Sequence, residues 1–162
     1  MIIAMGLDPA SFKNLGLCIA KIYSDRIEIM LKTTIVFDVD KETKDQRFVE
    51  LENKIQEYIT EYKVEEVVFE RTQFGKPFIM SQIYETIGVI KLVAIRNGAG
   101  LTGISPSTIK KLVTGNGKAK KPQMMRAITD LFSLNKKELS SEHEADAIGI
   151  CYAFSKINND TE

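Results

Sequence analysis

The stretch IIAMGLDPASFKNLGLCIAKIYSDRIEIMLKTTIV (residues 2–36) contains three apolar runs separated by short polar segments. Residues 2–7 and 16–23 are almost continuously apolar. In residues 26–36, Ile27, Ile29 and Leu31 alternate with polar neighbours until the apolar end of the run. These patterns predict three β-strands. Because the connections are short, with the SDR segment as a turn, we expect the three strands to form an antiparallel meander.

The rest of the chain alternates helical patterns with short apolar runs. Apolar residues at three- and four-residue spacing predict a helix over 42–62. We expect further strands at 64–70 and 100–105, and helices at 78–97, 106–115, 121–133 and 141–157. Ser105 followed by Pro106 is a typical helix start. Right-handed crossovers would make the later strands parallel to the first. The sequence therefore predicts an α/β fold whose five-stranded mixed sheet has three antiparallel hairpin strands plus two parallel ones, flanked by helices.

Length and composition indicate one domain. The 162 residues are 44% hydrophobic, which suffices for one core. We expect residues 1–157 to form this single domain and residues 158–162 a disordered tail. The chain has no run of 18 apolar residues, so we expect no membrane span. Its start, MIIAMGLDP, lacks the basic segment of a signal peptide and is better explained as a strand. Cys18 and Cys151 show no metal or redox spacing and are expected to be buried thiols in a reducing cytoplasm.

Positive charge is concentrated in one part of a chain whose formal net charge is zero. Residues 86–129 include no acidic residue but eight basic ones: Lys91, Arg96, Lys110, Lys111, Lys118, Lys120, Lys121 and Arg126. A basic surface of this kind suits a polyanionic partner. The plain alternative is a solvated surface that lacks carboxylates. The glycine-rich cluster GNGKAKKPQ (115–123) favours nucleic acid.

Four potential metal ligands are expected to meet at one edge of the sheet. Asp8 follows the first strand and Glu70 ends the fourth, so both lie at the same edge if these parallel strands are neighbours. His143 and Asp146 lie three residues apart on one side of the helix that starts in SEHEADAIGI (141–150). Singly, Asp8 could be a turn residue, Glu70 could pair with Arg71, and His143 could be solvated. Together, three carboxylates would repel one another unless a cation neutralised them. Such oxygen-rich sites select Mg²⁺ or Mn²⁺, and two ions about 4 Å apart can catalyse phosphodiester displacement.

Four segments of the chain resemble, in order and spacing, the motif regions of the RuvC-type Holliday junction resolvases. They are MGLDPASFKNLGLCIA (5–20), VEEVVFERTQF (64–74), SPSTIKKLVTGNGKAKKPQM (105–124) and HEADAIGICYA (143–153). Members of this family are homodimeric nucleases with a ribonuclease H-like fold. The resemblance implies that Asp8, Glu70, His143 and Asp146 bind catalytic metal, namely Mg²⁺ or Mn²⁺ with two ions per site. It also implies that Lys110 and Lys121 contact DNA near the cut and that Phe74 stacks on junction bases.

The chain departs from the family pattern at several positions. His143 stands where many members have aspartate, and it could ligate a metal or help to activate water. Ala10 replaces a usual glycine, and Phe74 comes one residue late. These differences are more typical of a phage-type member than of a cellular one, so we expect the cytoplasm of a bacterium or of a phage-infected host. They leave open whether the chain works with a branch-migration motor.

The function that we predict is metal-dependent resolution of Holliday junctions, extending to other branched DNA, by phosphodiester hydrolysis. The expected DNA-binding residues are Phe74, Lys110, Lys118, Lys120, Lys121 and Arg126. The nearest alternatives are a ribonuclease H-like nuclease acting on RNA–DNA hybrids and a nucleic-acid-binding module without chemistry. An actin-like ATPase would need a second lobe and a glycine-containing phosphate loop, and neither 162 residues nor the segment DPASFKN supplies them.

The helix predicted at 78–97 is the candidate dimer face. We expect it to expose a stripe of isoleucines with other large apolar residues nearby: Ile79, Ile83, Ile87 and Ile90, then Phe78, Tyr84 and Val89. We expect one side of this helix to pack on the sheet and the other to face a second copy of the chain. The family resemblance also implies a homodimer, and two-fold symmetry would place two identical sites on the two strands to be cut.

Overall fold

A five-stranded mixed sheet in the order β3-β2-β1-β4-β5 forms the centre of the fold. The computed structural model describes residues 1–9, 13–71, 75–135 and 138–159. The strands are β1 (Ile2–Asp8), β2 (Asn14–Ile22), β3 (Ile27–Val36), β4 (Glu66–Glu70) and β5 (Gly100–Ile104). β2 is antiparallel to both β1 and β3, whereas β4 pairs parallel with β1 and β5 pairs parallel with β4. The predicted α/β sheet, with three hairpin strands and two parallel strands, is confirmed.

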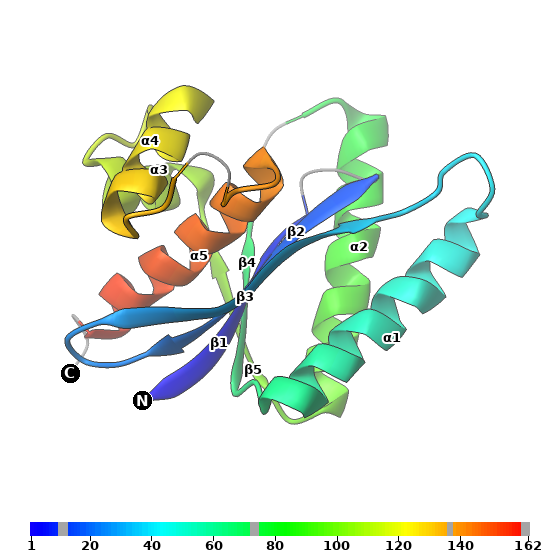
Figure 1. Ribbon diagram of the computed structural model, residues 1–162. Coiled ribbons are helices and arrows are strands. Elements are labelled where there is room, and N and C mark those ends of the chain that lie inside the picture. The colour runs from blue at the N-terminus through cyan, green and yellow to red at the C-terminus, as the bar shows by residue number, and fades with distance from the viewer. Residues whose placement is uncertain (10–12, 72–74, 136–137, 160–162) are drawn as a thin grey trace.

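Helices cover both faces of the sheet (Figure 1). They are α1 (Lys44–Tyr62), α2 (Pro77–Arg96), α3 (Pro106–Thr114), α4 (Lys121–Leu131) and α5 (Glu142–Asn159). α1 and α2 lie on one face, in a core shared with Met5, Leu7 and Leu17. α5 lies on the other face against β1 and β2, and α3 and α4 pack against α5. The alternation of side chains along β1 and β2 explains how one strand contributes to both cores.

α5 approaches β1 closely because Gly6 has no side chain. A Cβ atom on Gly6 would lie 2.7 Å from both the Ala147 carbonyl oxygen and Cys151 Sγ. The Cys151 thiol donates a hydrogen bond to the Cys18 carbonyl oxygen at 3.5 Å. Both cysteines are free and buried, as the sequence predicted. The hydrogen bond with Cys151 and burial raise the pKa of the Cys18 thiol well above its usual value.

α2 is long and apolar enough to cross a membrane by length and composition alone. Here it is a core helix, because Ile83, Ile87 and Ile90 pack between the sheet and α1. These three isoleucines were expected on an exposed stripe with Ile79, and that part of the prediction is wrong. The exposed large apolar residues of α2 are instead Phe78, Ile79, Tyr84, Leu92 and Ile95. The apolar helix therefore buries one side and leaves another uncovered.

Two boundaries differ from the predicted ones for identifiable reasons. The fourth strand begins at Glu66 and not at residue 64, since Val64 closes the end of α1 by donating from its N–H to the Ile59 carbonyl oxygen at 3.0 Å. α5 continues to Asn159, so the tail predicted from residue 158 is wrong for its first two residues. The Asn159 amide donates to the carbonyl oxygens of Tyr23 and Ser24, at 3.3 and 3.0 Å. These bonds tie the end of the helix to the β2–β3 turn.

Candidate active site

Asp8 and Glu70 leave the sheet at the same edge. Asp8 is the last residue of β1, and Glu70 is the last residue of the neighbouring parallel strand β4. The pairing of Leu7 with Phe69 sets the two carboxylates at the ends of adjacent strands. Asp8 is buried, with 3% of its surface exposed. The prediction that Asp8 and Glu70 lie at the same edge of the sheet is therefore confirmed.

α5 brings His143 and Asp146 to this edge. The His143 backbone rests on Gly16 of β2, where a Cβ atom would lie 2.0 Å from the His143 carbonyl oxygen. Gly16 is the register partner of Asp8, so this contact places the start of α5 directly over the end of β1. His143 Nδ1 lies 3.4 Å from Asp8 Oδ2. Only glycine at position 16 permits so close an approach.

One pocket of about 230 Å³ collects the predicted site residues. It is lined by Asp8, Glu70, Pro106, Ile109, Lys110, Lys121, Met124, His143 and Asp146. All four expected metal ligands and two of the expected DNA-binding lysines are therefore brought together. The lysines arrive on separate helices. Ser105 caps α3, which carries Lys110, and Lys121 begins α4.

The carboxylates of the pocket repel one another. Burial raises the pKa of Glu70 to about 7, and the negative charges of Asp8 and Asp146 contribute to this shift. Burial and the charge of Asp8 raise the pKa of Asp146 to about 6. The pKa of His143 is raised as well, chiefly by its hydrogen bond with Asp8. A cation in the pocket would relieve this repulsion, because it favours the ionised form of each neighbouring carboxylate.

The set of donor side chains in the pocket suits a hard divalent cation. Three carboxylates with one imidazole provide the oxygen-rich environment that Mg²⁺ and Mn²⁺ prefer. Within the described ranges, no three His, Cys, Asp or Glu side chains are already grouped as ligands of one ion. The chemistry of the lining residues therefore fits a divalent metal site.

Glu142 pairs with Lys121, a contact that the sequence did not predict. Lys121 Nζ lies 2.5 Å from Glu142 Oε2, at the mouth of the pocket. The hydrogen bond with Glu142 raises the pKa of Lys121, and the same bond lowers the pKa of Glu142. The two residues lie on different helices, so no short-range pattern could have revealed this contact.

Three other expected DNA-binding residues, Lys118, Lys120 and Arg126, lie outside the pocket lining. Lys118 and Lys120 are exposed in the connection between α3 and α4, which starts at Gly115 with a positive φ of 78°. Arg126 is exposed on α4, with its Nε 3.8 Å from Asp130 Oδ2. Phe74 lies outside the described residues. All six expected DNA contacts, Lys110 and Lys121 included, remain predictions.

Curated relatives match this chain over most of its length. The crossover junction endodeoxyribonuclease RuvC of Corynebacterium diphtheriae is 28% identical over 152 residues, and the match covers 93% of each protein. The protein of the same name from Bdellovibrio bacteriovorus is 30% identical over 153 residues, covering 93% of this chain and 89% of the relative.

Solved structures share the fold. T. thermophilus RuvC in complex with Holliday junction substrate superposes with a TM-score of 0.89 at 16% identity, covering 99% of this chain and 97% of that one. The Fowlpox virus resolvase, in complex with Holliday junction DNA, gives a TM-score of 0.59 at 15% identity, covering 99% and 98% of the two chains. At these identities the likeness concerns the fold, and it agrees with the predicted ribonuclease H-like architecture.

The family assignment rests on nearly the whole chain. The family model described as crossover junction endodeoxyribonuclease RuvC matches residues 4–154. This match includes every strand end and helix start that lines the pocket. The chain therefore belongs to the RuvC family of crossover junction endodeoxyribonucleases.

Proposed function

We propose that this chain is a metal-dependent, structure-selective endonuclease that resolves Holliday junctions and other branched DNA by phosphodiester hydrolysis. The observation that carries this function is the pocket in which Asp8, Glu70, His143 and Asp146 face Lys110 and Lys121. Carboxylates alone would repel a phosphodiester. The same carboxylates with bound cations, beside two lysines, can hold its phosphate.

Mg²⁺ is the ion that we propose, with Mn²⁺ as a substitute and two ions in each site. Asp8, Glu70, His143 and Asp146 would hold them, since these are the oxygen and imidazole donors that line the pocket. When bound, such ions polarise a phosphoryl oxygen and generate a nucleophilic water at neutral pH. The proposal draws support from the raised pKa values of Glu70 and Asp146, which indicate that cation binding is electrostatically favourable there.

The side chains around these donors have separate tasks. Asp8 orients the His143 ring through the contact at its Nδ1, and the same contact favours protonation of the imidazole. Lys110 and Lys121 provide positive charge where the phosphate enters, and this charge can stabilise the negative charge that develops during displacement. Glu142 holds the Lys121 ammonium at the pocket mouth until a phosphate competes for it.

The assembly that we propose is a two-fold homodimer through α2. A four-way junction must be cut on two symmetric strands, and an isologous dimer presents two identical sites in matching positions. The side of α2 that leaves Phe78, Ile79 and Tyr84 exposed offers apolar surface for such contact. An uncovered cluster of large apolar side chains on one helix is typical of an interaction surface.

The function is tested by cleavage of matched substrates. Four-way, three-way and linear DNA duplexes of the same arm sequence are incubated with the protein and Mg²⁺, together with an RNA–DNA hybrid. We expect paired cuts in the four-way junction, slower cutting of the three-way junction, and little cutting of linear DNA. Faster cutting of the hybrid than of any junction would instead favour the ribonuclease H-like alternative. Binding without any cutting in Mg²⁺ or Mn²⁺ would favour the non-catalytic module.

A further inference from the structure

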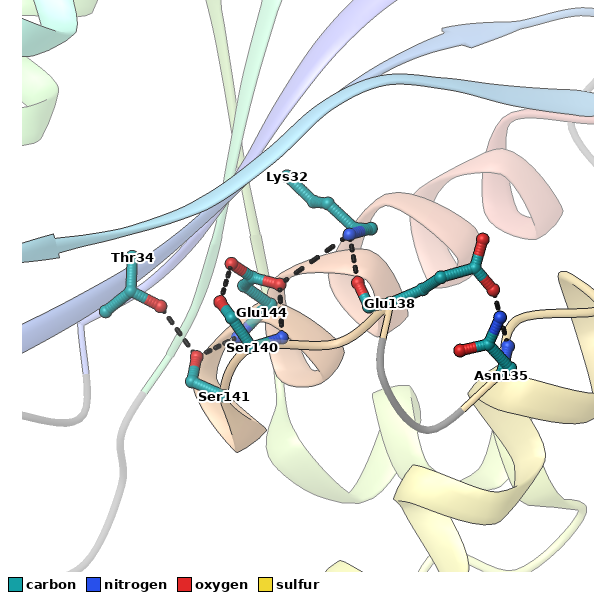
Figure 2. Close-up of polar contacts among 7 residues, drawn as sticks. All are labelled: Lys32, Thr34, Asn135, Glu138, Ser140, Ser141 and Glu144. Atoms are coloured by element: carbon teal, nitrogen blue, oxygen red, sulfur yellow. Dashed lines mark hydrogen bonds and ion pairs between the residues drawn. The ribbon is translucent and has the colours of Figure 1, made fainter.

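A buried carboxylate on α5 points away from the pocket. Glu144 lies between His143 and Asp146 in the sequence, but it does not line the pocket, and only 4% of its surface is exposed. Its partners lie in the segment before α5 and on β3 (Figure 2). A buried charge is tolerated only where it is paired and hydrogen-bonded. The contacts of Glu144 therefore constrain where the start of α5 can lie.

Glu144 is held by both Ser140 and Lys32. Its Oε1 accepts from Ser140 Oγ at 2.5 Å, and its Oε2 accepts from the Ser140 backbone N–H at 3.1 Å. Lys32 Nζ lies 3.9 Å from the same Oε2 and donates to the Glu138 carbonyl oxygen. Lys32 is a residue of β3. One side chain of the sheet thus joins both the loop before α5 and the first turn of α5.

A second contact ties the same turn to β3. Ser141 Oγ accepts from the Glu144 backbone N–H at 3.1 Å, as a residue that caps a helix does. It also shares a 2.6 Å hydrogen bond with Thr34 Oγ1, in which either hydroxyl can donate (Figure 2). The capping residue of α5 is therefore itself fixed by the sheet.

These contacts and the active site lie on one row across three strands. Gly16 of β2 is paired with Asp8 of β1 on one side and with Thr34 of β3 on the other. The backbone of His143 rests on Gly16, its side chain reaches Asp8, and Ser141 reaches Thr34. The start of α5 is thus attached to Asp8 of β1 at one end of the row and to Thr34 of β3 at the other. A shift of the helix toward or away from Asp8 would break the attachment at β3.

We propose that Lys32 and Thr34 are positioning residues, which act through Glu144 and Ser141 to hold His143 and Asp146 opposite Asp8 and Glu70. This inference rests on the proposed function, because it assigns β3 a role in the geometry of that same site. The first turn of a helix is the part most prone to fray, since its N–H groups have no partner within the helix. Two residues of the site lie at this end of α5. Their placement therefore depends on how firmly the first turn is anchored.

The test compares Thr34→Val with Thr33→Val. The two changes remove the same hydroxyl from neighbouring positions of β3, but alternate residues of a strand point to opposite faces. Thr33 is paired with Leu17, which belongs to the core on the α1 and α2 side, so Thr33→Val is the matched control. Lys32→Met removes the ammonium, and Lys32→Arg restores a cation at the same place.

We expect Thr34→Val and Lys32→Met to lower the single-turnover rate of junction cleavage by roughly 10- to 100-fold, the usual effect of losing a residue that orients metal ligands. The half-saturating Mg²⁺ concentration should rise. Affinity for junction DNA, measured in Ca²⁺, should match that of the wild type. Lys32→Arg should recover most of the lost rate. Rates and Mg²⁺ dependence equal to those of Thr33→Val would overturn the proposal.

Amide hydrogen exchange of the metal-free protein gives a readout that does not require cleavage. Thr34→Val and Lys32→Met should accelerate exchange in the first turn of α5, with little change in β1 or in the second half of α5. Uniform acceleration across the protein would mean a general loss of stability and would contradict a positioning role. If the wild type cuts no junction, the proposed function fails, yet the exchange pattern still supports or rejects the anchoring of α5 by β3.

Discussion

His143 Nδ1 lies 3.4 Å from Asp8 Oδ2, so the single histidine of the chain faces the most deeply buried carboxylate of the pocket. This contact gives the ring a fixed direction. It also explains why the pKa of His143 is raised, because Asp8 stabilises the protonated form. With a metal ion held by Asp8, the imidazole would be available as a ligand or as a proton acceptor.

Substitutions at His143 should distinguish a ligand from a bystander. His143→Asp should retain appreciable cleavage, since a carboxylate can serve as an oxygen ligand from the same helix position. His143→Ala should lower the single-turnover rate by about 10²- to 10⁴-fold, the usual range for loss of an acid–base group. The measurement is single-turnover cutting of a four-way junction in Mg²⁺. If His143→Ala cuts at the wild-type rate, His143 is an ordinary solvated residue of the helix with no role in cleavage.

Removing a carboxylate of the pocket should separate binding from chemistry. Asp8→Asn and Glu70→Gln are expected to abolish cutting while leaving most of the affinity for junction DNA. Ca²⁺ should permit binding but no efficient cleavage, because its longer and looser coordination fits the reaction poorly. Glu66→Gln is the matched control, since Glu66 belongs to the same strand but pairs with Thr102 outside the pocket. If Asp8→Asn cuts as fast as this control, the assigned site is wrong.

The stability of the metal-free protein should fall as pH rises from 5 to 8. The folded-state pKa values of Glu70 and Asp146 are about 7 and about 6, above the ordinary values of 4.5 and 3.8. A carboxyl group whose pKa is raised in the folded state stabilises the fold fully at pH values below its ordinary pKa. This stabilisation is lost as the pH rises through the folded-state pKa. Urea unfolding at pH 5 and pH 8 measures this loss.

Two comparisons make the pH prediction specific. Glu70→Gln should stabilise the metal-free protein at pH 8 by on the order of 1–3 kcal/mol and flatten the pH dependence. Mg²⁺ should stabilise the wild type more at pH 8 than at pH 5, because protons compete with the metal for the same oxygens. A pH-independent unfolding midpoint in wild type and variant alike would show that the carboxylates do not repel one another as described.

Lys121 and Glu142 should have opposite effects on DNA affinity. Lys121→Ala is expected to weaken binding to junctions of every sequence and to reduce the salt slope by about one. Glu142→Gln should tighten binding, since it removes a negative charge that pairs with Lys121 at the pocket mouth. Lys54→Ala on α1, across the sheet from the pocket, is the control. The measurement is a salt titration of affinity, and unchanged slopes would place the DNA path elsewhere.

A charge on the exposed side of α2 should break the proposed dimer. Ile79→Glu is expected to give a monomer by light scattering and to replace paired cuts with single nicks. Val49→Glu on α1 is a suitable control, because Val49 is also an exposed large apolar residue. A wild-type protein that is monomeric at working concentration and still cuts both strands would contradict the dimer.

The sequence predicted the fold and the convergence of the site where the signals were local. Ser105 and Pro106 indicated a helix start, and Ser105 indeed accepts from the Thr108 N–H. Asp8 and Glu70 could be placed together because each stands at the carboxyl end of a strand in a parallel pair. The burial of Ile83 and Ile87 depends on how α2 is rotated against the sheet, which a continuously apolar helix does not reveal.

Contacts between distant side chains could not be predicted in this way. The pairs Lys121–Glu142 and Lys32–Glu144 join different elements, and each residue alone resembles an ordinary surface charge. The role of Gly16 could not be predicted either, since a glycine in a strand has several explanations. Its contact with the His143 backbone emerges only once α5 is laid on the sheet.

The two buried thiols, Cys18 and Cys151, can be used to measure how often α5 separates from the sheet. Cys18 belongs to β2 and Cys151 to α5, and each is sealed by the contact between these elements. A thiol-specific reagent can reach them only when α5 lifts from the sheet, and the raised pKa of Cys18 keeps its thiol unreactive while closed. Labelling kinetics would therefore time that opening in the native chain, without any introduced probe. Slower labelling in the presence of metal or junction DNA would show that binding holds α5, which carries His143 and Asp146, against the sheet.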